Sequence, residues 1–145
     1  KGFQDPGMNS FNHYWLGCVS EWLITQAAGI DTDGPGFQRI KIYPELVKPE
    51  QGFSWVKAKY DSIRGPVASQ WKVDGNKFVL EIGIPANTTA TVYVPARDVA
   101  DVTEGGRPIA NAKGVKFVRV ENGRAILEVG SGNYQFASRR FMEAQ

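Results

Sequence analysis

The sequence predicts a mainly β fold, an antiparallel, jelly-roll-like β-sandwich preceded by one N-terminal α-helix. From Phe53 onward the chain consists of short segments in which apolar and polar residues alternate, the period of a half-buried strand. Turn-forming pairs such as Asn122–Gly123 separate these segments, and no helical pattern lies between them. Only residues 10–28 repeat their apolar positions at the spacing of an α-helix.

The N-terminal segment is expected to form one helix over residues 10–28. Ser10 is a suitable N-cap because its hydroxyl can accept a hydrogen bond from a backbone N–H of the first turn. Gly29 lies where a left-handed residue commonly ends a helix. Large apolar side chains surround most of the helix: Phe11, Trp15, Leu16, Val19, Trp22 and Leu23. A helix that is apolar on most sides requires neighbours on several of them.

The division of the chain follows from its composition. Residues 29–36 are rich in glycine and aspartate and are expected to form a linker. We therefore divide the chain into a helical part at residues 1–36, a β domain at residues 37–138 and a tail at residues 139–145. A β region of about a hundred residues is large enough to bury a core of its own.

Within the β domain the strands are assigned by alternation. The clearest strand has Phe78, Leu80, Ile82 and Ile84 on one face, between polar neighbours. The other expected strands lie at residues 39–43, 56–60, 67–73, 91–94, 115–120, 124–129 and 133–137. The expected core residues are Phe78, Leu80, Ile82, Val92, Val94, Phe117, Val118, Ile126, Leu127, Tyr134 and Phe136. Alternation leaves open which of the neighbours Phe117 and Val118 faces inward.

Composition argues against several classes of protein. The net charge is +2 and no basic run extends beyond Arg139–Arg140, which argues against nucleic-acid binding. No apolar stretch approaches the roughly 20 residues of a membrane-spanning helix. With one cysteine and one histidine, neither a metal site nor a cofactor is expected, and Cys18 is expected as a small buried side chain. The composition fits cytoplasmic, periplasmic and secreted proteins alike.

His13 is the candidate ligand-binding residue. It falls in the first turn of the expected helix, whose partial positive charge disfavours the imidazolium form. A neutral imidazole donates one hydrogen bond and accepts another, and beside Asn9 and Asn12 it suits a polyhydroxylated ligand. The alternative is a capping or core histidine bonded to the backbone, and the residues alone favour that alternative.

Several motifs occur together along the chain. The most specific is the run Met8–Tyr14, which is followed by Glu21, Trp22 and Leu23. Further motifs are Ala28–Ile30, Pro35–Phe37, Tyr60–Ser62, Arg64–Gly65, Trp71 and Pro85–Ala90. In this combination the chain resembles the bacterial α-L-rhamnosidase family over most of its length.

The resemblance implies that the chain is the C-terminal fragment of an inverting glycoside hydrolase, in which a catalytic (α/α)6 barrel precedes a C-terminal β-sandwich. Residues 1–36 would then be the end of that barrel. The family histidine that contacts the rhamnose ring matches His13, although Trp15 stands where smaller residues are common. The family's two catalytic carboxylates belong to motifs upstream of His13 that this chain lacks.

No residue of the chain is therefore expected to be catalytic. The parent protein is expected to act on rhamnose-containing glycosides or polysaccharides, whereas the isolated chain is expected to hydrolyse nothing. Glu21 is expected to be a solvated helix position, and it is not paired with Asp5 as an acid and a base. Without the rest of the barrel, the helix is expected to fold back on the sandwich, pair with a second copy or fray.

Two alternative functions come from other classes of protein. A non-catalytic carbohydrate-binding module would use exposed aromatic side chains on strands, for which Trp55, Tyr60, Trp71 and Tyr93 are the candidates. Strand aromatics are more often core residues or cross-strand pairs. A purely structural accessory domain is the other alternative.

Overall fold

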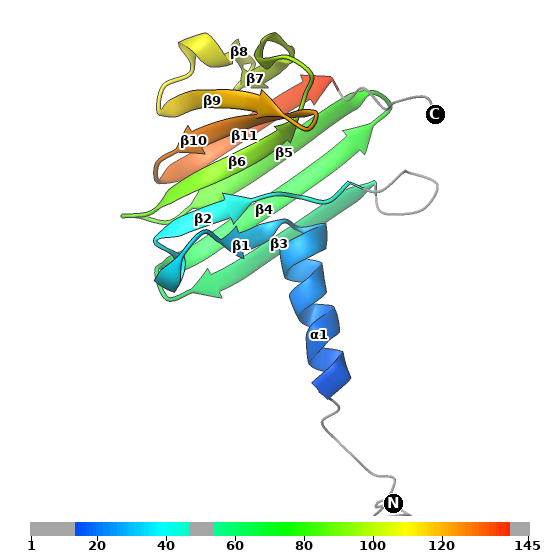
Figure 1. The fold of residues 1–145 in the computed structure, drawn as a ribbon, viewed down its shortest axis with the longest axis vertical. Helices are drawn as coiled ribbons and strands as arrows, with labels where there is room; N and C mark the ends of the chain where they lie inside the picture. Colours follow the sequence, from blue (N-terminus) through cyan, green and yellow to red (C-terminus); the bar gives the residue numbers. More distant parts are fainter. Residues whose placement is uncertain (1–13, 47–53, 140–145) are drawn as a thin grey trace, which may run out of the picture.

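Two β-sheets packed face to face make up most of the computed structural model, which describes residues 14–46 and 54–139 (Figure 1). The first sheet has the strand order β1-β2-β6-β10-β9 and the second the order β3-β4-β5-β11-β7-β8. Neighbouring strands are antiparallel, except that β2 and β6 pair in parallel. The predicted mainly β sandwich with one N-terminal helix is confirmed, with this parallel pair as an addition.

The strands of the first sheet are β1 (Ile30–Thr32), β2 (Arg39–Ile42), β6 (Thr89–Pro95), β9 (Val115–Glu121) and β10 (Arg124–Val129). Those of the second sheet are β3 (Trp55–Ser62), β4 (Gly65–Asp74), β5 (Lys77–Ile84), β7 (Val102–Glu104), β8 (Arg107–Pro108) and β11 (Gly132–Arg139). Short 3₁₀ turns lie at η2 (Pro35–Phe37), η3 (Val99–Asp101) and η4 (Ile109–Asn111).

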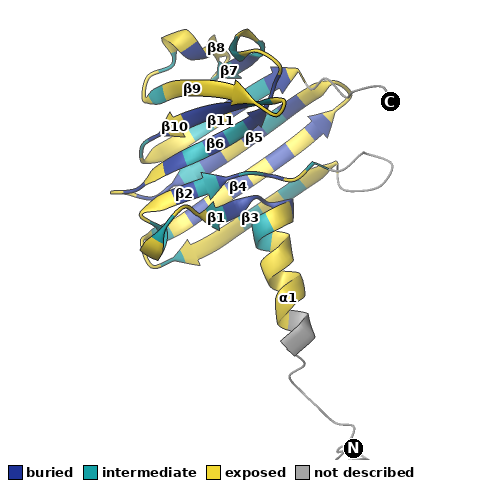
Figure 2. Ribbon diagram, viewed as in Figure 1, coloured by how far each residue is buried: buried dark blue, intermediate teal, exposed yellow. Residues whose placement is uncertain are grey.

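The helical segment consists of an α-helix, α1 (Tyr14–Trp22), and a π-helical turn, η1 (Leu23–Ala27). From Tyr14 onward this segment matches the helix expected over residues 10–28. Residues 10–13 lie outside the described residues. The turn ends where the Ala28 N–H donates to the Leu23 carbonyl at 3.0 Å. Figure 1 shows α1 extending away from the sandwich, and Figure 2 shows that its described surface is mostly exposed.

The alternation of apolar and polar residues in the sequence correctly predicted which side chains of β4 and β5 face inward. In β4 the inward positions Val67, Ser69, Trp71 and Val73 are buried and their neighbours are exposed. In β5 the same holds for Phe78, Leu80, Ile82 and Ile84, with Val79 and Gly83 half-buried. Residues Gly75 and Asn76 form the turn between the two strands. These inward side chains pack with those of β2, β6, β10 and β11 into one core between the sheets.

The linker expected over residues 29–36 is wrong in part, because it contains strand β1. Ile30 pairs with Ile42 of β2 and is buried in the core. Three residues show too little alternation to reveal a strand among glycines and aspartates. The same holds for β7 and β8, which the sequence did not predict.

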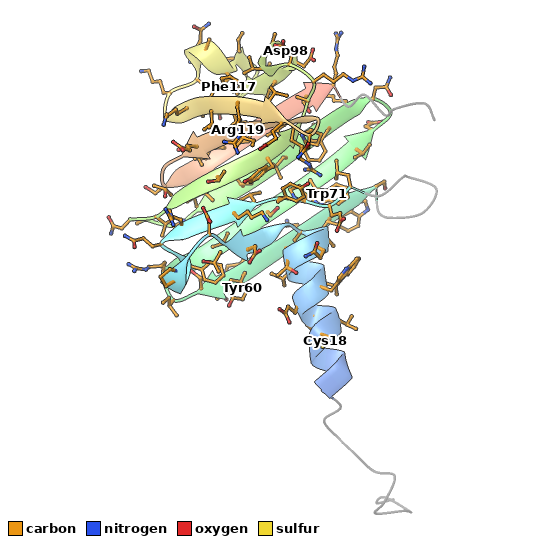
Figure 3. All side chains as sticks on the ribbon, in the orientation of Figure 1. Cys18, Tyr60, Trp71, Asp98, Phe117 and Arg119 are labelled. Atoms are coloured by element: carbon orange, nitrogen blue, oxygen red, sulfur yellow. The ribbon has the colours of Figure 1, made fainter. Side chains whose placement is uncertain are left out.

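The expectation that Phe117 and Val118 belong to the core is also wrong. They are 39% and 36% exposed because β9 is the outer strand of its sheet (Figure 3). The pairing of β9 with β10 shifts between Ile126 and Leu127. The extra residue of this irregularity is Val118 of β9, so β10 keeps its regular alternation. Leu127 faces the core, and Ile126 is buried on the opposite face of the sheet.

Candidate functional site

Two buried side chains of β4 bind the end of the helical segment. The Trp71 indole N–H donates to the Ala27 carbonyl at 2.7 Å, and the Ser69 hydroxyl donates to the Ala28 carbonyl, also at 2.7 Å. Both side chains are at most 1% exposed. The last carbonyls of a helix have no partner inside the helix, so the sandwich supplies the missing donors.

Two backbone groups complete this anchor. The Glu45 N–H donates to the Gln26 carbonyl at 2.9 Å, and the Tyr43 N–H donates to the Gly29 carbonyl at 2.7 Å. The carbonyls of residues 26–29 are thus bonded, one after another, to groups of the β domain. The direction in which α1 leaves the sandwich is fixed by these four hydrogen bonds, which we call the carbonyl anchor.

Gly29 permits the close approach that the carbonyl anchor requires. Its φ is +73°, a conformation that side-chain-bearing residues rarely adopt. A Cβ atom at this position would lie 2.1 Å from the backbone N of Pro44. The sequence analysis assigned Gly29 to the end of the helix; its contact with the connection after β2 was not predicted.

Exposed apolar side chains gather beside the carbonyl anchor. Val19, Trp22 and Leu23 of the helical segment are 56%, 49% and 43% exposed, and Trp55 of β3 is 63% exposed. A groove of about 680 Å³ lies between η1 and β3, lined by Leu23, Ile24, Ala27 and residues 54–59. We call these side chains and the groove the helix–β3 surface. An exposed apolar surface of this kind on a folded chain commonly marks a site where a protein partner binds.

The four strand aromatics considered above do not form one platform. Trp55 lies opposite Lys72 and Trp71 opposite Val56, so the two tryptophans project from opposite faces of the same sheet. Trp71 is buried in the core, where Figure 3 places it close to the end of the helical segment. Tyr93 belongs to the other sheet and makes an edge contact with Tyr43.

The remaining site predictions have different outcomes. His13, with Asn9, Asn12 and Asp5, lies outside the described residues, so its role stays a prediction. Glu21 is exposed on α1, as expected for a solvated position. Cys18 is also exposed, contrary to expectation, on the part of α1 that extends away from the sandwich (Figure 3).

Within residues 14–46 and 54–139 no three histidine, cysteine or acidic side chains are grouped so that they could hold a metal ion. In the same part of the chain no helix is both long and apolar enough to span a bilayer.

Comparison with known sequences identifies relatives of the chain. Residues 29–107 match the family described as "Bacterial alpha-L-rhamnosidase C-terminal domain". The chain is 39% identical over 137 residues to an alpha-L-rhamnosidase of Streptomyces avermitilis, covering 93% of the chain and 12% of that protein. It is 28% identical over 139 residues to one of Formosa agariphila, covering 96% of the chain and 15% of that protein. The chain thus spans 12–15% of the length of these relatives.

Solved structures show the same similarity. The crystal structure of the Streptomyces avermitilis alpha-L-rhamnosidase complexed with L-rhamnose superposes with a TM-score of 0.78 at 37% identity, over 95% of this chain and 12% of the other. The structure of an alpha-L-rhamnosidase from Dictyoglumus thermophilum gives a TM-score of 0.77 at 30% identity, over 97% of this chain and 15% of the other.

Proposed function

Because the chain belongs to the bacterial alpha-L-rhamnosidase C-terminal domain family, we propose that it is the C-terminal portion of an enzyme that removes terminal α-L-rhamnose from glycosides. In this proposal the β-sandwich braces the last helix of the catalytic barrel, and the rest of the barrel supplies the catalytic acid and base. The rhamnosidases to which the chain is similar are much longer proteins, which leaves room for such a catalytic part.

The carbonyl anchor is the observation that carries this proposal. It holds one end of the helical segment to the sandwich through four hydrogen bonds, while α1 leaves the sandwich and exposes apolar side chains. Each large apolar side chain left in water forgoes roughly 1.5–3 kcal/mol of burial. A parent barrel packed on the helix–β3 surface would recover this free energy and place the helix at a fixed angle.

The division of the parent chain follows from the same contacts. We place the end of the barrel at η1 and the start of the sandwich at β1, because Ile30 is already part of the core. Within the parent, His13 would donate or accept a hydrogen bond with a rhamnose hydroxyl. His13 precedes α1 in the sequence, so this proposal assigns it to the barrel part of the parent.

Inversion requires a carboxylic acid and a carboxylate about 6.5–9.5 Å apart, with a water between the base and the sugar. Glu21 is exposed on α1 and is not assigned to either role. The chain would therefore contribute substrate contact and support, and both catalytic carboxylates would come from the preceding part of the parent.

The test uses the parent protein, with turnover of an aryl α-L-rhamnoside and thermal unfolding as readouts. His13→Ala should lower turnover at least tenfold and leave the unfolding temperature unchanged.

Trp22→Ser with Leu23→Ser should lower the unfolding temperature of the parent by several degrees, since both side chains would be buried against the barrel. Ile63→Ser is the matched control, because Ile63 is 84% exposed on the turn between β3 and β4. Unchanged turnover in His13→Ala would remove the substrate contact, and unchanged stability in the double variant would remove the bracing role.

A further inference from the structure

One end of the sandwich carries a pocket that the proposed function does not use. Three turns meet there: the β1–β2 connection, the β5–β6 turn and the β10–β11 turn, all on the left in Figure 1. The pocket has a volume of about 650 Å³, within the range of small-molecule sites, about 300–1,000 Å³. Its lining residues share none with the helix–β3 surface.

This loop-end pocket is lined by Pro35, two glycines and a larger set of polar side chains, whose charges cancel. Besides the buried Thr88, the polar side chains are Asp33, Gln38, Arg39, Asn87, Thr89 and Ser131. These six side chains comprise one carboxylate, one guanidinium, two amides and two hydroxyls. A site for a metal ion would need more carboxylates, and a site for a phosphate would need more cations. The balance favours an uncharged polar ligand.

Hydrogen bonds hold the first of the three turns in place. The Arg39 Nε–H donates to the Asp33 carbonyl at 3.0 Å, which fixes the guanidinium beside the pocket. The Thr32 hydroxyl donates to the Gly34 carbonyl in the same turn. The Thr89 N–H donates to the Gln38 carbonyl at 3.2 Å and so joins this turn to the β5–β6 turn.

The second turn is held as firmly. Thr88 is 4% exposed, and its hydroxyl donates to the Pro85 carbonyl at 2.6 Å. Asn87 has a φ of +58°, which is uncommon for a residue with a side chain and more tolerable for asparagine than for most. From this turn Asn87 contributes to the lining of the pocket. Groups that are already held in position lose little conformational entropy when a ligand binds.

Neighbouring hydroxyls of a sugar ring can form hydrogen bonds with each of the groups that line the pocket. Each hydroxyl both donates and accepts a hydrogen bond, a carboxylate only accepts, a guanidinium only donates, and an amide does both. A pair of adjacent hydroxyls can therefore satisfy several of these groups at once without carrying charge into the site.

We propose that the loop-end pocket binds an uncharged glycan unit, a pyranose ring with adjacent free hydroxyls. The pocket is formed by the described sandwich alone, so the proposal holds whether or not the parent is a rhamnosidase. Binding there would hold a glycan on the C-terminal domain while leaving the helix–β3 surface free for the barrel.

The experiment is a titration of the ¹⁵N-labelled 145-residue chain, followed by backbone amide shifts. The probes are methyl α-L-rhamnopyranoside and the methyl glycosides of mannose, galactose and glucose, with galacturonate, inorganic phosphate and Ca²⁺ as charged comparators. At least one uncharged glycoside should shift the amides of residues 33–39, 87–89 and 130–131 with a millimolar dissociation constant. The proposal is overturned if no uncharged glycoside shifts these amides at tens of millimolar, or if phosphate or Ca²⁺ shifts them more strongly.

Asn87→Gly is the decisive variant, because glycine retains the left-handed turn and removes only the amide side chain. Asn122→Gly is its matched control: Asn122 has a φ of +50° in the β9–β10 turn and does not line the pocket. Loss of the Asn87 amide should weaken binding about tenfold, and the control should bind as the unaltered chain does. Equal affinity of the Asn87 variant, or equal weakening in the control, would contradict the assignment. This titration tests only the pocket. The proposed rhamnosidase activity of the parent is tested separately, by its turnover of an aryl α-L-rhamnoside.

Discussion

At the scale of single residues, Trp71 and Gly29 carry the connection between helix and sandwich. Trp71 fills the core and also donates its indole N–H to the Ala27 carbonyl. Gly29 lets the chain pass against Pro44 at a distance that no side chain would allow. One residue acts by what its side chain supplies, and the other by having none.

Trp71→Phe should destabilise the chain by about 1–3 kcal/mol, because it leaves the buried Ala27 carbonyl without its donor. Urea unfolding followed by circular dichroism measures this loss. Trp55→Phe is the control, since Trp55 is 63% exposed, and its effect should stay within about 0.5 kcal/mol. Equal losses in the two variants would show that the indole hydrogen bond contributes nothing.

Gly29→Ala should destabilise the chain by more than about 2 kcal/mol, from the unfavourable φ and the overlap with Pro44. Gly17→Ala should have the opposite sign, a gain of roughly 0.5–1 kcal/mol. Gly17 lies inside α1 with nothing within 4 Å of an added Cβ, and alanine favours helix more than glycine does. Thermal unfolding of both variants measures the contrast, and a stable Gly29→Ala chain would refute the close approach.

At the scale of elements, the helical segment is anchored at one end only. Its η1 end is bonded to the sandwich, whereas α1 exposes Val19 and Trp22 to solvent. At the opposite side of the molecule, β9 leaves its outer edge without a neighbouring strand among the described residues. Its register shift and its charged side chains are features that disfavour pairing with another chain.

Amide hydrogen exchange of the isolated chain should therefore be graded along the helical segment. The Ala28 amide is bonded to Leu23 at the end of η1, and the Tyr43 amide donates one of the bonds of the carbonyl anchor, so both should exchange slowly. The amides of α1 should exchange much faster, since few packed contacts oppose local opening. Protection in α1 equal to that of β4 and β5 would mean that something covers the helix.

At the scale of the whole molecule, two surfaces with different chemistry lie at separate places. The helix–β3 surface is apolar, and the loop-end pocket is polar with balanced charge. The first suits a protein partner and the second a small uncharged ligand. The sandwich can therefore support the barrel and hold a glycan without either interfering with the other.

If the barrel is missing, the isolated chain should associate with itself through the helix–β3 surface. Trp22→Ser with Leu23→Ser should shift the chain towards the monomer in sedimentation velocity, and Ile63→Ser should leave association unchanged. A chain that is monomeric at high concentration with α1 ordered would contradict this prediction.

The pure chain should also release no product from an aryl α-L-rhamnoside, because the proposal assigns both catalytic carboxylates to the preceding part of the parent. Rates at the level of buffer alone are the expected result, measured with the parent protein as the positive control. Hydrolysis that increases with the concentration of chain would refute the assignment of catalysis to the preceding part.

The sequence by itself determined which faces of the regular strands turn inward, because successive side chains of a strand point to opposite sides. Phe78 to Ile84 could be assigned in this way, and so could the family, from motifs that need no structure. Only the tertiary structure decided which side chains are buried at the positions where alternation gives no answer. Phe117 is exposed because β9 has no outer neighbour among the described residues. Whether Trp71 or Trp55 faces the core depends on which face of their sheet packs against the other sheet. Two bonds of the carbonyl anchor, and the lining of the loop-end pocket, bring together residues more than forty positions apart. Such contacts arise only once the sheets have packed.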